Sequence, residues 1–281
     1  MFPLLGSGLG LRREHYREVI ETRPAVDWFE VISENFMGTG GNPRRVLESV
    51  RRDYPLVLHG VSLSIASTEP LDRRYLDQLA ALARDIQPAW ISDHLCWGTA
   101  HGINAHDLLP VPYTEEALAH VAERVDAVQE HLGQRILLEN PSSYLAYRDV
   151  DMTEYDFLAE LSRRADCGIL LDVNNIFVSA HNHGFDPHAY LAAIPAERVG
   201  QIHLGGHLQE GSLLIDTHDG PVRDEVWQLY AEAIARLGPR STMIEWDAHV
   251  PELHELQAEL TRAAAWEKEA LARRQGLRDA A

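Results

Sequence analysis

The chain has 281 residues, of which 45% are hydrophobic, and this is enough for one large core. Its net charge of −18, from 43 acidic and 25 basic residues, argues against general binding to nucleic acid or to an anionic membrane. No run of about 18 apolar residues predicts a membrane span, and the N-terminus lacks the features of a signal peptide. The two cysteines, Cys96 and Cys167, provide no disulfide framework, so we expect a cytoplasmic protein.

Strand and helix signals alternate along the whole chain. Short apolar runs predict strands at residues 4–11, 28–32, 56–59, 89–94, 135–139, 168–172, 199–203 and 241–245. The first helix is expected to end near residue 22, and a short helix is expected to begin at Asp186. The other helices are expected at residues 43–52, 72–85, 114–131, 153–165, 221–237 and 251–273. Thr114 is the expected N-cap of its helix. We expect a single domain over residues 1–281, with a flexible tail at about 274–281.

Eight strand–helix alternations in a chain of this length predict an α/β fold of the (β/α)₈ TIM barrel type. The competing fold is an open, doubly wound sheet, which usually carries a glycine-rich phosphate turn after its first strand. Here the glycines at 6, 8 and 10 lie within the first expected strand and do not open a helix. The pattern therefore favours the barrel. Two long connections, residues 97–112 and 177–185, are expected to be loops that cover its mouth.

Six consecutive expected strands each end in a residue whose side chain is able to bind a metal. These residues are His59, Asp93 with His94, Glu139, Asp172, His203 and Glu245. The carboxyl ends of barrel strands meet on one face, where barrel enzymes place their chemistry. A single charged residue there needs only solvent, but a ring of carboxylates and imidazoles is costly unless cations neutralise it. The repetition therefore predicts a metal site.

Further candidate ligands lie in the segments after two of these strands. Asp216 and His218 are two residues apart, so in an extended segment both side chains point the same way, toward one metal ion. His181 and His183 have the same spacing after Asp172, although loop histidines more often contact substrate or solvent. Imidazole and carboxylate without thiolate suit iron, manganese or zinc. The large number of candidates suits two or three ions that share a bridging carboxylate.

Nine stretches, in order over almost the whole chain, match one known family. They are Glu30-Val-Ile-Ser-Glu-Asn35, His59-Gly-Val-Ser-Leu-Ser64, Ser92-Asp-His-Leu95, Leu138-Glu-Asn-Pro141, Leu171-Asp-Val-Asn-Asn175, Asn182-His-Gly-Phe-Asp-Pro187, Ile202-His-Leu-Gly-Gly-His207, Asp216-Thr-His-Asp-Gly-Pro221 and Glu245-Trp-Asp247. Each is weak alone, but together they are specific. The sequence resembles the DUF692 (UPF0276) family of multinuclear non-haem iron-dependent oxidases.

The resemblance implies a barrel that holds two or three iron ions and uses O₂ to modify cysteine residues of a ribosomally made precursor peptide. Several members of that family need a small partner protein that presents the peptide. Carried over by position, the implied iron ligands are Glu139 as a bridge, Asp172, His203 and Glu245 at one centre, His59 and His94 at the second, and Asp216 and His218 at a third. Asn175 is the further ligand that the resemblance suggests, with His183 as its rival. Asp93 and Asp247 are expected to orient ligand histidines.

Two other classes of protein fit parts of the pattern. A xylose-isomerase-like barrel, either a sugar isomerase or a phosphodiesterase, also places Glu, Asp and His around divalent ions. The acidic composition argues against a nuclease, because DNA binding needs a basic surface. A non-enzymatic metal-binding scaffold would use the same ligands for storage. Iron content with O₂ uptake separates the oxidase from both.

Overall fold

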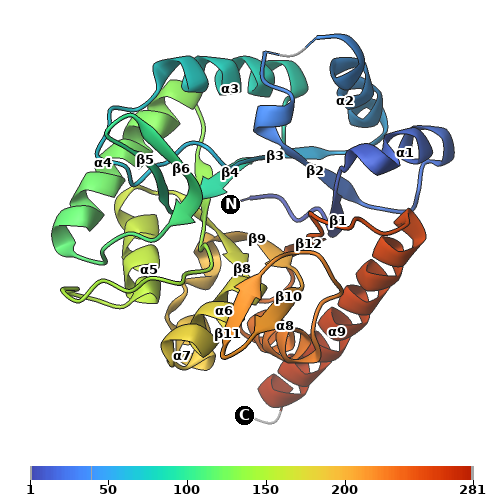
Figure 1. Ribbon diagram of the computed structural model, residues 1–281. Coiled ribbons are helices and arrows are strands. Elements are labelled where there is room, and N and C mark those ends of the chain that lie inside the picture. The colour runs from blue at the N-terminus through green and yellow to red at the C-terminus, as the bar shows by residue number, and fades with distance from the viewer. Residues whose placement is uncertain (1, 39, 280–281) are drawn as a thin grey trace.

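A closed barrel of eight parallel strands forms the centre of the molecule (Figure 1). The computed structural model describes residues 2–38 and 40–279. The barrel strands are β1 (Ser7–Gly10), β2 (Trp28–Ile32), β3 (Leu56–Gly60), β4 (Ile91–His94), β7 (Ile136–Glu139), β8 (Gly168–Asp172), β9 (Val199–Leu204) and β12 (Ser241–Ile244). They pair in the order β1-β12-β9-β8-β7-β4-β3-β2, which returns to β1. The predicted TIM barrel is confirmed.

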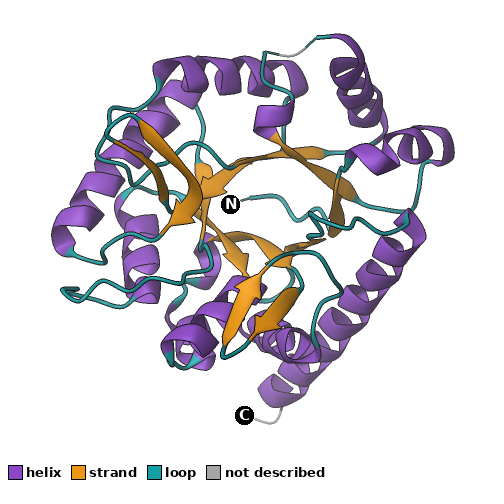
Figure 2. Cartoon of the chain, viewed as in Figure 1, coloured by secondary structure: helices purple, strands orange, loops and turns teal. Residues whose placement is uncertain are grey.

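Helices surround the barrel on the outside (Figure 2). They are α1 (Tyr16–Thr22), α2 (Gly41–Asp53), α3 (Arg73–Ile86), α4 (Glu115–Leu132), α5 (Glu154–Arg164), α6 (Val173–His183), α7 (Pro187–Ala193), α8 (Asp224–Leu237) and α9 (Leu253–Asp279), with the short 3₁₀ helices η1 (Arg13–His15), η2 (Ser33–Asn35) and η3 (Ala196–Arg198). Thr114 caps α4 by accepting a hydrogen bond from the amide of Ala117, as its position predicted. No described helix combines the length and apolarity needed to cross a lipid bilayer.

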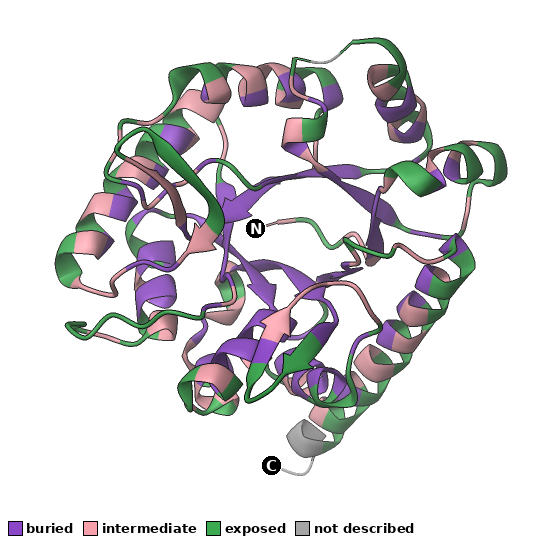
Figure 3. Ribbon diagram, in the orientation of Figure 1, coloured by how far each residue is buried: buried purple, intermediate pink, exposed green. Residues whose placement is uncertain are grey.

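The barrel strands are buried on both faces, whereas much of the surrounding surface is exposed (Figure 3). Helices cover the outer face, and the N-terminal segment packs into one end of the interior, where Phe2 and Leu5 contact a buried cluster that includes Trp28 and Trp90. A side-chain carbon at Gly168, the first residue of β8, would overlap the ring of Phe2. Glycine at this position therefore lets the N-terminal segment close one end of the barrel.

Two hairpins stand where loops were expected. Segment 97–112 contains β5 (Trp97–Ala100) and β6 (Ile103–Leu109), joined by His101 and Gly102 with φ of 52° and 72°. Two left-handed residues between paired strands form the tight turn that suits a hairpin. The second hairpin, β10 (His207–Glu210) and β11 (Leu213–Asp216), turns at Gly211, whose φ is 62°.

Two helices also differ from expectation. The segment after β8 is helix α6 and not a loop, because Asp172 ends the strand and at once caps the helix, with Oδ1 2.6 Å from the amide nitrogen of Asn175. The proposed cover over residues 177–185 is therefore mostly helical. Helix α9 continues to Asp279, so residues 274–279 are helical where a tail was expected, and residues 280–281 lie outside the described part.

Candidate metal centre

The barrel interior changes from apolar to polar within one step along the strands. Alternate strand residues face the same side, so the inward side chains form layers. One layer is a buried apolar cluster that contains Trp28, Val57, Trp90, Leu137, Leu170 and Met243. Two positions further along the same strands are the buried polar residues Glu30, His59, Ser92, Glu139, Asp172 and Glu245. The polar layer therefore packs against the apolar layer and lies on its side nearer the carboxyl ends of the strands.

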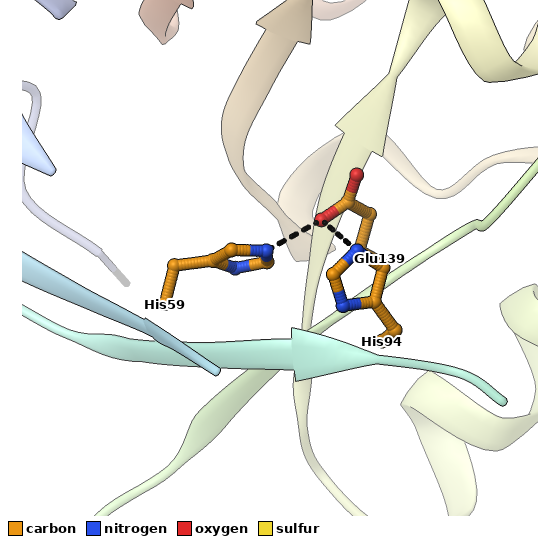
Figure 4. Close-up of side chains that lie close together, drawn as sticks. All are labelled: His59, His94 and Glu139. Carbon is orange, nitrogen blue, oxygen red and sulfur yellow. Dashed lines mark ion pairs between the residues drawn. The ribbon is translucent and has the colours of Figure 1, made fainter. Parts of the chain in front are cut away.

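The first group of candidate ligands is His59, His94 and Glu139 (Figure 4). Both imidazoles point Nε2 at one carboxylate oxygen, Oε2 of Glu139, at 3.3 Å from His59 and 3.5 Å from His94. Their other nitrogens are held from behind, since Nδ1 of His59 lies 2.9 Å from Oγ of Ser92 and Nδ1 of His94 lies 3.1 Å from the carbonyl oxygen of Gly60. These contacts fix both rings with Nε2 toward the centre.

The second group is Glu139, Asp172, His203 and Glu245, whose ligand atoms all lie within 4.8 Å of one another. Nδ1 of His203 is 3.0 Å from Oε2 of Glu245 and 3.7 Å from Oε1 of Glu139. Glu139 therefore turns one oxygen to the first group and the other to the second. This is the geometry expected of a carboxylate that bridges two ions.

The third group is His218, Glu245 and Asp247. Nδ1 of His218 lies 3.5 Å from Oε2 of Glu245, so Glu245 joins the second and third groups. Nε2 of His218 lies 2.9 Å from Oδ1 of Asp216 and 3.9 Å from Oδ2 of Asp172. Asp216 and His218 lie close together, but His218 has a left-handed backbone, with φ of 44°, and not the extended one on which the prediction from their spacing rested.

Buried ligand atoms without hydrogen-bond partners test whether these groups suit a metal. Among the described residues, such atoms include His59 Nε2, Glu139 Oε2, Asp172 Oδ2, Asn175 Oδ1, His203 Nδ1 and His218 Nε2. These six belong to candidate ligands, whereas the other such atoms are on Glu30, Ser33, Glu34, Trp227, Arg240 and Trp246. The six ligand atoms lie close to one another without being aligned to bond among themselves. Because unpaired buried polar atoms are costly, their convergence fits cations that accept their lone pairs.

A cavity of about 230 Å³ opens onto the three groups and gives a substrate access to them. The candidate ligands His59, His94, Glu139, Asn175, Asp216, His218 and Glu245 contribute to its wall. Leu108 of the β5–β6 hairpin and Asp216 of the β10–β11 hairpin both line it, so the two hairpins flank the mouth. Segment 97–112 therefore borders the mouth, as expected, but as a hairpin.

Comparison with known proteins agrees with this geometry. A family model described as RiPP precursor modification enzyme MbnB/TglH/ChrH matches residues 6–268. The chain belongs to this family. It is 62% identical over 269 residues to a UPF0276 protein of Anaeromyxobacter sp. (strain Fw109-5), covering 96% of this chain and 95% of that protein. It is 54% identical over 264 residues to a UPF0276 protein of Caulobacter vibrioides (strain NA1000 / CB15N), with 94% of each covered.

Solved structures with the same fold are distant in sequence. D-psicose 3-epimerase from Clostridium cellulolyticum H10 has a TM-score of 0.62 at 12% identity, over 95% of this chain and 99% of the epimerase. Endonuclease IV from Thermus thermophilus has a TM-score of 0.61 at 18% identity, over 95% of this chain and all of that chain (100%). At these identities the likeness supports the TIM barrel fold and not an activity.

Three predicted residues of this family member lie around α6. Asn175, in its first turn, donates a hydrogen bond from Nδ2 to the carbonyl oxygen of Asn140, which leaves Oδ1 toward the cavity. His183, at the end of the helix, lies away from the three groups, with Nε2 2.8 Å from Oγ of Ser143. Nε2 of His181 lies 3.1 Å from the carbonyl oxygen of Ser212. The geometry therefore supports Asn175 over its rival His183.

Asp93 and Asp247 were both expected to orient ligand histidines, and only Asp247 approaches an imidazole in the contacts described below. Asp93 accepts hydrogen bonds from the amides of His94 and Leu63 and from the hydroxyl of Tyr75, so it holds backbone and not an imidazole. Asp247 does approach Nδ1 of His218, at 3.9 Å, but it is also a member of the third group and forms an ion pair with Arg12.

Burial and crowding shift the pKa values of the central residues in opposite directions. Burial alone would lower the pKa of His203, yet the surrounding carboxylates of Glu30, Glu245 and Glu139 raise it well above its usual value. Burial would raise the pKa of Glu245, but His218 and His203 lower it well below its usual value. The raised pKa of His203 reflects the negative potential of the carboxylates around it, and the same potential favours cations.

Two residues of the centre were not among the predicted ligands. Glu30, on β2, places Oε2 3.1 Å from Nε2 of His203 and accepts a hydrogen bond from Gln201. The sequence signal was present, because Trp28 and Glu30 repeat the apolar-then-polar step of Val57 and His59. Arg12 follows β1, and no inward-facing side chain on that strand points to it in the sequence. Its pairing with Asp247 could therefore not be predicted in the same way.

Proposed function

We propose that the protein is a multinuclear non-haem iron enzyme that uses O₂ to modify cysteine residues of a ribosomally made precursor peptide. The observation that carries the proposal is the chain of three ligand groups joined through Glu139 and Glu245. Carboxylates shared between groups are typical bridges in centres with several ions. Membership of a family that modifies precursor peptides supports a peptide as the substrate. A set of imidazole and carboxylate ligands suits iron, and three joined groups suit two or three ions.

Each group would hold one iron. His59, His94 and Glu139 would hold the first, and Glu139, Asp172, His203 and Glu245 the second. His218 would hold the third together with Glu245 and Asp247, with Asp216 beside its Nε2 and Asn175 as a further ligand. Bound iron with an open position supplies O₂ activation and a binding point for the cysteine sulfur. The ligand residues come from six different barrel strands or the segments after them, so the barrel itself sets their geometry.

The remaining residues position the ligands and restrict water. Glu30 fixes the ring of His203 by contacting Nε2, which leaves Nδ1 facing the second group. Arg12 restrains Asp247 at the rim of the third group. Ile32 and Leu108 supply apolar wall to the cavity, so that a bound peptide displaces water from the reacting atoms.

We place this reaction in the cytoplasm, where ribosomes make the peptide, and we propose that a small partner protein presents the peptide at the cavity. Co-purification of the protein with a small protein encoded beside its gene tests the second point. If the protein alone turned over the peptide at the full rate, the partner protein would be removed from the proposal.

The decisive experiment combines metal analysis with turnover. The protein is purified, loaded with ferrous iron without oxygen, and mixed with a cysteine-containing peptide encoded beside its gene. We expect two or three irons per chain, O₂ uptake that depends on the peptide, and a mass change confined to a fragment that contains cysteine. The same peptide with serine in place of cysteine is the control. Zinc or manganese in the purified protein, with neither O₂ uptake nor peptide modification, would instead favour a metal-dependent isomerase, a phosphodiesterase or a storage scaffold.

A further inference from the structure

A second cavity lies directly beside the metal centre. It has a volume of about 260 Å³ and is formed by segment 143–155 and the end of α6. Aromatic and apolar side chains make most of its wall, among them Tyr113, Met152, Tyr155 and Phe185. One carboxylate, that of Glu154 in the first turn of α5, also lines it. We call this cavity the Glu154 pocket.

Glu154 is a carboxylate without a cationic partner. Its two oxygens accept hydrogen bonds from the hydroxyls of Tyr113 at 3.0 Å and Tyr190 at 2.8 Å. Within residues 2–38 and 40–279, no Lys, Arg or His forms an ion pair with it. His183 also lines the pocket, but its Nε2 is engaged by Ser143. Burial raises the pKa of Glu154, which reflects the cost of a desolvated charge that a cation would offset.

The pocket adjoins the metal cavity through two segments. Ser142 lines the metal cavity and the next residue, Ser143, lines the Glu154 pocket. Likewise Leu108 lines the metal cavity, while Pro110 lines the Glu154 pocket. An extended peptide with one residue at the metal centre therefore reaches the pocket within a few residues.

We propose that the Glu154 pocket binds a Lys or Arg side chain of the precursor peptide and thereby selects peptides that carry a basic residue near the modified cysteine. The inference rests on the proposed function for its substrate class. The apolar wall suits the aliphatic stem of such a side chain, and the rings of Tyr155 and Phe185 suit its charged head. The carboxylate of Glu154 supplies the opposite charge. The net charge of −18 also attracts basic peptides to the molecule.

A selection experiment tests the pocket without requiring turnover. Ten-residue peptides with a fixed central cysteine and random flanks are displayed and selected for binding to the iron-loaded protein in the absence of oxygen. We expect enrichment of Lys or Arg at one fixed distance from the cysteine. Replacing that basic residue by methionine in a selected peptide is expected to weaken binding about tenfold or more, because a charge-assisted contact is lost.

Two variants and one control locate the effect. Glu154→Gln keeps the size of the side chain but removes its charge, so the preference for the basic peptide over its methionine counterpart is expected to disappear. Ala146→Trp, at an exposed position that lines the pocket, is expected to block it without disturbing the core. Glu123→Gln, at an exposed position on α4, removes the same charge elsewhere and is expected to bind like the original protein.

The outcomes separate this inference from the proposed function. Peptides without a positional basic preference, or a preference that survives both pocket variants, would overturn the basic-residue pocket. Failure to enrich any peptide would overturn it too. In either case the iron content and O₂ uptake of the protein are measured independently, so the proposed function stands or falls on its own assay.

Discussion

The carboxylate of Glu30 lies 3.1 Å from Nε2 of His203, across the barrel and 173 positions away in sequence. Together with Nε2 of Gln201, which lies 2.6 Å from the same nitrogen, this contact decides which nitrogen of His203 can bind a metal. With Nε2 engaged by Glu30, Nδ1 is left facing Glu245 and Glu139. A carboxylate behind a ligand histidine fixes the ring and strengthens it as a ligand.

We therefore expect Glu30→Ala to weaken iron binding about 10–100-fold, because the ring of His203 loses its support. Glu30→Gln can still accept a hydrogen bond and is expected to have a smaller effect. Titration of the iron-loaded protein with a competing chelator measures the affinity. Glu123→Ala, at an exposed position, is the control. Unchanged affinity in Glu30→Ala would show that Glu30 does not position this ligand.

Asp172 has two roles that one substitution can separate. Its Oδ1 caps α6, whereas Oδ2 is buried without a hydrogen-bond partner. Asp172→Asn retains an oxygen for the cap and removes the charge. We expect the variant to bind at least one iron fewer, as shown by metal analysis. Circular dichroism should show the same fold.

The same variant is expected to be more stable than the original protein when both are metal-free. Burial raises the pKa of Asp172 well above its usual value, against the lowering influence of His218, so the ionised form is costly in the folded state. Removing such a functional charge commonly adds about 0.5–2 kcal/mol to the free energy of unfolding. Urea denaturation of both metal-free proteins measures this. A full metal complement in Asp172→Asn would contradict the assignment.

The stability of the metal-free protein should fall as pH rises above about 6.5, the ordinary pKa of histidine. The pKa values of His203 and His218 are raised in the folded state, so the protons on both rings stabilise the fold at a pH below the unfolded-state pKa. This stabilisation is lost as the pH rises from the unfolded-state pKa through the folded-state pKa. Asp172 acts in the same direction, because its raised pKa means that the folded state binds more protons. Urea denaturation across this range measures the slope. Iron replaces these protons, so the loaded protein should show a smaller slope, and equal slopes would argue against the assigned ligands.

The strand ends were predictable because a buried parallel strand is a continuous apolar run, and the residue that ends it is conspicuous. His59, Glu139 and Asp172 all follow such runs. Glu30 was missed because it lies inside its strand and Val31 and Ile32 continue the run. His183 was retained as a candidate because spacing alone does not reveal that α6 turns its last residues toward Ser143.

The ion pair at the rim of the third group depended on a contact that no local pattern encodes. Arg12 and Asp247 meet only because β1 and β12 are neighbours in the closed barrel. The Glu154 pocket likewise draws its wall from segments that lie apart in the chain, such as Pro110 and Phe185. Strand ends identify the site, but the contacts between distant segments define its surroundings.

Gly205 provides the sharpest test of the third group. A side-chain carbon there would lie 2.5 Å from Nε2 of His218 and closer still to its Cδ2. His218 cannot easily withdraw, because its amide donates to Gly206 at 3.0 Å and its carbonyl oxygen accepts from Asp247 at 2.7 Å. Gly205→Ala is therefore expected to lose the iron of the third group and keep that of His59 and His94.

Misplacing a ligand in this way is expected to lower peptide turnover about 100-fold. Gly220→Ala is the matched control, since a side-chain carbon at Gly220 would meet nothing within 4 Å. Metal analysis and turnover of both variants, with circular dichroism to confirm folding, complete the comparison. If Gly205→Ala bound the full complement of iron and turned over peptide like Gly220→Ala, the third group would not be a functional metal site.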